Sequence, residues 1–457
     1  AMSHRAVANL ILWQIEEAEL GEGAKTAQFH SFSFDVSCQE MFSTWSSGGT
    51  LVLITEDDRK DVNQLLHTLS DTGVARLFLP PVALQQLAEA PVDRPLPKSL
   101  KHVIAAGEQL QITDPLISLF RRLENCALHN QYGPTESHIV TEFPLPLSPD
   151  EWKKAPPIGR PIANTQMHLL DEQFQQVPIG VPGQLYIGGV AVARGYLNRP
   201  QLTAERFMPD PLSDQPGERV YRTGDLARYL PDGNIEFLGR VDNQVKVRGF
   251  RIEPGEIESV LRRHPAVQEA VVVVRGQENK RLIAYLIAEH NSTPPSTTEL
   301  IRFCGETLPA YMIPSVFVFL EALPLTPSGK VDRRSLPAPD QQRPSLERMF
   351  VAPRTPVEQS LADIWKDVLG LRQVGVNDNF FELGGHSLLA TQVVSRVRTT
   401  LEVELPLRSI FESPTIALLA VEITCMQLKE IEENDLARIL TELEQLSEEE
   451  ARALLGD

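Results

Sequence analysis

The chain has 457 residues, enough for two to four domains at about 100 to 200 residues each. Lysine and arginine total 43 against 61 aspartates and glutamates, a formal net charge of −18, which argues against a nucleic-acid or anionic-membrane partner because either would need a basic surface. Four widely spaced cysteines form no metal or disulfide framework, and neither a signal peptide nor a long apolar run occurs. The sequence therefore predicts a cytoplasmic protein that binds neither nucleic acid nor membrane.

The first part of the chain alternates strand-like and helix-like segments. Apolar runs lie at 50–54, 74–79 and 102–106, and helical patterns lie at 62–69 and 115–123. This alternation predicts an α/β layer fold on a mainly parallel sheet. From 144 to 239 short strand-like segments separated by Gly and Pro, with an Asp232-Gly233 turn, predict a β-rich subdomain.

Three further regions follow along the chain. Residues 256–308 read as helix, two strands and helix, a small α/β module. A proline-rich stretch from 337 to 355 predicts an extended linker, and helical patterns at 357–369, 387–400 and 416–428 predict an all-α bundle.

The C-terminal tail has apolar residues at helical spacing between polar ones. One interpretation is a solvated terminal helix. The other is a docking or interdomain helix, since an apolar stripe without a core needs a partner.

Four short segments concentrate the chemistry. Tyr132-Gly133-Pro134-Thr135-Glu136 predicts a tight turn at a strand end, where a hydroxyl and a carboxylate suit phosphate and Mg²⁺. In the segment 221–225, Asp225 follows a glycine and suits the two hydroxyls of a ribose. Residues 244–251 alternate valine with basic residues as on a β-ribbon, and the loop 327–332 presents Lys330. Each alone is equally typical of a plain turn, strand or solvated loop.

Together and in this order, these segments resemble the core motifs of the adenylate-forming superfamily, and within it the adenylation domains of nonribosomal peptide synthetases. The resemblance covers residues 3–336. The matching segments are 34–37, 130–136, 183–196, 221–226, 239–258, 308–314 and 324–334.

A last segment, 377–388, places Ser387 after Gly384-Gly385-His386 and before an amphipathic helical pattern. A serine there is also typical of a plain helix cap. The whole phrase resembles the phosphopantetheine attachment site of a peptidyl carrier protein, with Ser387 as the modified residue, and this match covers 356–425.

The resemblance implies that an amino acid carboxylate attacks the α-phosphate of ATP with the help of Mg²⁺, and that 4'-phosphopantetheine on Ser387 then takes the acyl group. It implies the following roles: Tyr132 and Gly107 beside adenine, Thr135 at phosphate, Glu136 at Mg²⁺, Asp225 at the ribose, Arg240 near the nucleotide, Lys330 at the substrate carboxylate and adenylate oxygens, and Asp242 as the hinge. The expected catalytic residues are thus Lys330, Thr135 and Glu136. The expected partners are a phosphopantetheinyl transferase and a downstream condensation or ketosynthase domain.

The resemblance also implies a substrate pocket. Its positions are Asp35, Val36, Gln39, Phe78, Ile104, Ala106, Gln131, Ile139, Val140 and Lys330. Asp35 is the family's partner for the substrate ammonium, which favours an α-amino or imino acid, and the mostly apolar remainder disfavours a charged side chain. The set most resembles proline-activating pockets, although Gln131 stands where those usually have His. An aryl-propanoid acid is the alternative substrate.

Members of the family carry a Gly/Ser/Thr-rich phosphate loop shortly before the position of residues 3–7, and this sequence starts after it. We therefore expect a large domain truncated at its N-terminus and three later regions. The expected domains are a partial adenylation large domain at 1–242, a small α/β lid domain at 243–336, a linker at 337–355, a four-helix carrier bundle at 356–425 and a helical tail at 426–457.

Two other functions stay open. The chain is alternatively an acyl- or aryl-acid-activating starter module of a hybrid peptide-polyketide synthetase, or a non-catalytic carrier and docking fragment. A free acyl-CoA ligase would have no need of the segment around Ser387.

Overall fold

The computed structural model divides into two compact units, Ala1–Ile252 and Glu253–Asp457. It describes residues 1–17, 23–90, 95–123, 125–242, 244–247, 250–276, 280–289, 293–325, 331–339, 343–344, 346 and 348–428. Within those residues no helix combines the length and the apolar character needed to cross a membrane.

The first unit is built on a seven-stranded sheet with the order β2-β1-β3-β4-β5-β6-β7. Its strands are β1 (Lys25–Gln28), β2 (Thr50–Leu53), β3 (Arg76–Leu79), β4 (His102–Ala105), β5 (Ala127–Tyr132), β6 (Thr141–Pro144) and β7 (Arg160–Pro161). The pairs β2–β1, β1–β3, β3–β4 and β4–β5 are parallel, while the pairs β5–β6 and β6–β7 are antiparallel. The predicted α/β layer with a mainly parallel sheet is confirmed.

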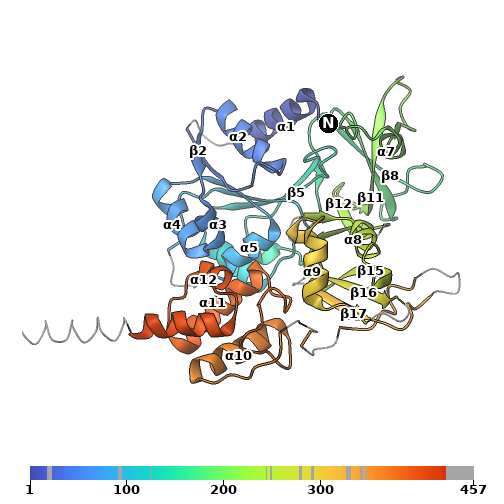
Figure 1. Ribbon diagram of the computed structural model, residues 1–457. Helices are drawn as coiled ribbons and strands as arrows, with labels where there is room; N and C mark the ends of the chain where they lie inside the picture. Colours follow the sequence, from blue (N-terminus) through green and yellow to red (C-terminus); the bar gives the residue numbers. More distant parts are fainter. Residues whose placement is uncertain are drawn as a thin grey trace, which may run out of the picture. The chain divides into compact units, whose positions relative to one another are not determined.

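Helices cover both faces of this sheet (Figure 1). Helices α1 (His4–Glu17) and α2 (Val36–Ser46) lie on one face. Helices α4 (Val62–Thr72), α5 (Pro81–Ala88) and α6 (Asp114–Arg122) lie on the other, and the short helix α3 (Glu56–Lys60) precedes α4. The main core joins α4, α5 and α6 to one set of strand residues, which includes Leu77, Val103 and Leu128. Because side chains alternate along a strand, the residues between these point to the opposite face. Phe78 and Ile104, paired in register, pack there against Val36 of α2.

The predicted β-rich subdomain is a second sheet with the order β10-β11-β9-β8, in which β12 also pairs with β11. Its strands are β8 (Thr165–Leu170), β9 (Gly183–Gly189), β10 (Phe207–Pro209), β11 (Arg219–Tyr229) and β12 (Ile235–Arg240), and α7 (Pro200–Arg206) precedes β10. The predicted ribbon forms as the antiparallel pair β13 (Val245–Val247) and β14 (Phe250–Ile252). The first unit ends at Ile252, so it includes this ribbon.

The second unit begins with the small α/β module that the sequence predicts. Helices α8 (Pro254–Leu261) and α9 (Thr297–Gly305) accompany a three-stranded sheet of β15 (Val267–Arg275), β16 (Arg281–Ala288) and β17 (Val316–Phe319). The first two strands are antiparallel, and β17 runs parallel to β16.

The described part of the carrier region holds four helices: α10 (Pro356–Leu369), α11 (Ser387–Leu401), α12 (Leu407–Glu412) and a last helix at 416–428. The local sequence sets the ends of α10. Thr355 accepts a hydrogen bond from the Glu358 amide, Pro356 occupies the first turn, and Gly370 ends the helix in the left-handed conformation with φ 69°. The helices share one apolar core around Trp365, Phe380 and Leu361, so the predicted all-α bundle is confirmed.

Leu361 has no solvent exposure in this core, whereas Leu418 is 52% exposed on the last helix. We expect Leu361→Ala to lower the free energy of opening of the carrier helices by about 2–5 kcal/mol, because the truncation removes buried apolar contacts and leaves a cavity. Hydrogen exchange of peptides from 356–428 measures this, with Leu418→Ala as the matched control. Equal effects of both variants would contradict this packing.

Candidate functional site

The turn after β5 is the first element of the site. A Cβ at Gly133 would lie 1.7 Å from the carbonyl oxygen of His138, so the backbone passes too closely for any residue but glycine. Beyond this turn Thr135 is exposed and Glu136 is buried. The turn therefore separates the two polar groups that the sequence singles out, leaving the hydroxyl toward solvent and the carboxylate inside.

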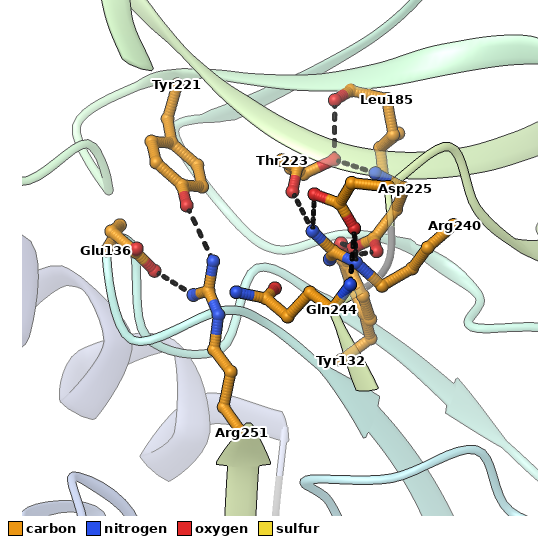
Figure 2. A network of polar contacts seen from close by, with 10 residues as sticks. Tyr132, Glu136, Leu185, Tyr221, Thr223, Asp225, Arg240, Gln244 and Arg251 are labelled. Carbon is orange, nitrogen blue, oxygen red and sulfur yellow. Dashed lines mark hydrogen bonds and ion pairs between the residues drawn. The ribbon is translucent and has the colours of Figure 1, made fainter. Parts of the chain in front are cut away.

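Asp225 lies in β11 where the register with β9 is interrupted, an irregularity that re-aims side chains. It accepts a hydrogen bond from the Tyr132 hydroxyl, and its Oδ1 lies 2.5 Å from Nη1 of Arg240. Nε and Nη2 of Arg240 also donate to Oδ1 and Oδ2 of Asp242, each at 2.7 Å. Burial and the charge of Asp225 raise the pKa of Tyr132. The structure thus brings four residues with predicted nucleotide or hinge roles into one network, of which Figure 2 labels Tyr132, Asp225 and Arg240.

Glu136 is the centre of a second group of contacts in the same view (Figure 2). Its Oε2 lies 2.6 Å from Nη1 of Arg251 on β14, a contact that Figure 2 shows. Its Oε1 accepts a 2.5 Å hydrogen bond from the Tyr196 hydroxyl. Arg251 Nη2 donates to the Tyr221 hydroxyl at 3.2 Å. Burial alone would raise the pKa of Glu136, but Arg251 and the Tyr196 hydrogen bond outweigh it and lower that pKa. Glu136 is therefore a charged, well-oriented carboxylate.

The ribbon places a second cation beside the nucleotide residues. Lys246 on β13 has its Nζ 5.9 Å from the centre of the Tyr132 ring, within cation–π range. Burial lowers the pKa of this ammonium. Positive charge from the ribbon therefore lies next to both Tyr132 and Glu136.

Asp35, the predicted ammonium partner, immediately precedes α2 and is half-buried. His138 ties it to the turn. The Ile139 amide donates to Nδ1 of His138 at 2.8 Å, so Nε2 carries the proton and donates to the Asp35 carbonyl at 2.9 Å. Burial lowers the pKa of His138, which favours this neutral form. One neutral histidine thus holds the start of α2 against the segment that carries Glu136.

The apolar residues of the predicted pocket fall into three groups. Val36, Phe78 and Ile104 form one buried cluster between α2 and the sheet. Ala106 and Ile139 share a second cluster with residues of α1, and Val140 packs with Tyr132 in the core of the β-rich sheet.

Two predicted pocket residues are amides, Gln39 and Gln131, and they bond to each other and to Gln14 of α1. The prediction from the sequence missed Gln14. A signal was present, because Gln14 lies three residues after Ile11 and four after Leu10, both buried, on the inner face of the helix.

In the carrier region, Ser387 begins α11 and His386 is the residue before it. A Cβ at Gly385 would come within 2.4 Å of the buried Phe380 ring, so glycine is required at this close approach. The neighbouring Asp378 is fully buried, pairs with Arg343 at 2.6 Å and accepts from the Gly375 amide at 2.7 Å. The segment that leads to Ser387, residues 378–386, is therefore held by a packed aromatic ring and a buried ion pair.

The remaining predicted residues are placed as follows. Gly107 follows β4 with φ +99°, a conformation that favours glycine. Lys330 and residues 429–457 of the tail lie outside the described residues, as does the side chain of Ser387.

Comparison with known protein families divides the chain into three matched regions. Residues 1–197 match the AMP-binding enzyme family, residues 256–330 match the AMP-binding enzyme C-terminal domain, and residues 359–421 match the phosphopantetheine attachment site family.

Individual relatives agree with this order. The chain is 46% identical over 423 residues to tyrocidine synthase 2 of Brevibacillus parabrevis and 45% identical over 425 residues to gramicidin S synthase 2 of Brevibacillus brevis. These alignments cover 92% and 91% of this chain but 12% and 9% of the relatives.

A solved structure of an NRPS protein containing adenylation and PCP domains superposes with a TM-score of 0.73 at 27% identity, covering 91% of this chain and 68% of that one. The chain therefore belongs to the AMP-binding, adenylate-forming enzymes, with the adenylation and carrier regions of a nonribosomal peptide synthetase in that order.

Proposed function

We propose that the chain is the part of a synthetase module that activates a proline-like amino acid with ATP and loads it onto a carrier thiol. The observation that carries the proposal is the set of contacts in Figure 2, in which Tyr132 meets Asp225, 93 positions away, and Glu136 meets Arg251, 115 positions away. Polar groups drawn together from several strands and loops at a sheet edge are typical of a ligand site.

The nucleotide would be held by the carboxylate of Asp225 and the ring of Tyr132. Asp225 is buried and receives one contact from Tyr132 and one from Arg240. A carboxylate has about four acceptor positions, so this one keeps capacity for ribose hydroxyls. Arg240 supplies the positive charge that this buried carboxylate needs as its partner.

Glu136 is the residue that would hold Mg²⁺. The described residues contain no group of three or more potential metal-ligating side chains, and Mg²⁺ in nucleotide sites is commonly bound by one or two carboxylates together with substrate phosphates. A single ionised carboxylate beside the exposed Thr135 fits that pattern. The ion would supply positive charge to the phosphate oxygens as negative charge shifts among them.

The second half-reaction would take place on the carrier. Ser387 would hold the phosphopantetheine, whose thiol would supply the nucleophile that takes the acyl group from the aminoacyl adenylate, with AMP as the leaving group. A downstream condensation or ketosynthase domain would receive the thioester.

The attachment point is tested by modification. We expect a phosphopantetheinyl transferase with coenzyme A to add one phosphopantetheine mass to the chain, and Ser387→Ala to abolish the addition because the accepting hydroxyl is gone. Intact-protein mass spectrometry measures it. Ser395→Ala, an exposed serine on the same helix, is the control, and full modification of the Ser387→Ala variant would refute the assignment.

The role of Lys330 is tested on a version of the protein extended at its N-terminus to include the family's phosphate loop. We expect Lys330→Ala to raise the adenylation barrier by roughly 3 to 4 kcal/mol, because a cation is lost from developing negative charge, and to affect transfer from a preformed adenylate much less. ATP–pyrophosphate exchange and single-turnover acyl transfer separate the two steps. The exposed Lys153→Ala is the control, and equal loss in both steps would make Lys330 structural.

The substrate is tested with a panel in the same exchange assay, run on the chain and on the extended version. We expect proline to give the strongest exchange, because Asp35 pairs with an ammonium and the cluster of Val36, Phe78 and Ile104 suits a compact apolar ring. Strong exchange with an aryl-propanoid acid and none with proline would establish the starter-module alternative. No exchange with any acid in either version would favour a non-catalytic carrier fragment.

A further inference from the structure

A buried group of three glutamines lies where α1, α2 and β5 meet. The carbonyl oxygen of Gln14 accepts two hydrogen bonds, from Nε2 of Gln39 at 2.5 Å and from Nε2 of Gln131 at 3.0 Å. All three side chains are at least 97% buried. Gln14 is thus the common acceptor for both amides of the predicted substrate pocket, although it lies outside that predicted set.

A carboxylate determines which way the amides face. Nε2 of Gln131 also lies 3.1 Å from Oε1 of Glu142, and an ionised carboxylate only accepts hydrogen bonds. Gln131 must therefore present its NH₂ group to Glu142 and to Gln14. Its carbonyl oxygen then faces Gln39 and accepts from Nε2 of that residue at 3.1 Å.

This arrangement uses both N–H groups of Gln39 and leaves its carbonyl oxygen. Among the residues that the structure describes, none donates to Oε1 of Gln39, although that atom is buried. An unpaired buried acceptor costs about 1–3 kcal/mol, and a bound donor would recover much of that cost.

Gln39 lies on α2 four residues after Asp35, which precedes the helix and already has helical backbone angles (φ −62°, ψ −31°). Residues four apart on a helix lie on the same face, with about 5–6 Å between their Cβ atoms. A substrate ammonium held by Asp35 would therefore lie next to Gln39.

We propose that Gln14 is a positioning residue for substrate selection, which holds Gln39 so that Oε1 accepts one N–H of the substrate ammonium while Asp35 pairs with its charge. The inference rests on the proposed function, since it takes Asp35 and Gln39 as pocket residues. It adds that the site distinguishes ammonium groups by their number of N–H donors. A secondary ammonium has two, one for each partner, whereas an N-methylated one has only one.

The test compares two stable mimics of the adenylate, prolyl-sulfamoyl adenosine and its N-methylprolyl counterpart, by calorimetry on the 457-residue chain. We expect the unaltered chain to bind the prolyl compound at least about tenfold more tightly, since the methylated one leaves Gln39 unpaired. In Gln14→Met the acceptor is lost, and we expect the preference to fall toward one. Gln14→Glu keeps an acceptor oxygen and is expected to retain most of the preference.

Gln28→Met is the matched control, because Gln28 is an equally buried glutamine on β1 that bonds to His30 and Glu40 instead. Thermal unfolding of each variant separates folding from selection. An unchanged preference in a folded Gln14→Met variant would overturn the inference alone. Failure of the unaltered chain to bind either compound would overturn the proposed function and the inference together.

Discussion

The alternation of side chains along β3, β4 and β5 is the constraint that places the predicted pocket residues on one face of the sheet. Every second residue must face α4, α5 and α6, where Leu77, Val103 and Leu128 fill the main core. The intervening residues therefore point to the face that α1 and α2 cover, and the parallel register places Phe78 beside Ile104. A core on one face thus places the predicted pocket residues Phe78 and Ile104 on the other, and a shift of one residue in register would exchange the two faces.

Burial of charge is a second constraint on the structure. Each carboxylate that the fold takes from water at the site has a guanidinium partner, Arg240 for Asp225 and Arg251 for Glu136. Without Arg251, burial would raise the pKa of Glu136. Both arginines come from the end of the first unit, β12 and the ribbon, so the last residues of that unit supply the positive charges that pair with Asp225 and Glu136. The same need for partners explains the glutamine group, in which polar atoms from three elements satisfy one another.

The carrier region differs, because the predicted attachment residue Ser387 begins helix α11. The Phe380 ring packs against the backbone at Gly385 closely enough to exclude a side chain there, and the buried Asp378–Arg343 pair braces the preceding segment. Close packing and a satisfied buried charge therefore limit how far the start of α11 can move.

The sequence by itself determined the order of the layers, the β-ribbon and the carrier helices, because periodicity, caps and short motifs are local properties. The roles of the nucleotide residues follow from the resemblance and stay predictions. Gly133 was readable as a turn residue, but only the folded chain shows that His138 would collide with any other side chain. The pairing of Arg251 with Glu136 joins residues 115 positions apart, and that of Gln14 with Gln131 spans 117. No local pattern encodes such contacts, because they depend on how strands and helices pack in three dimensions and on where a buried polar group can find its partner.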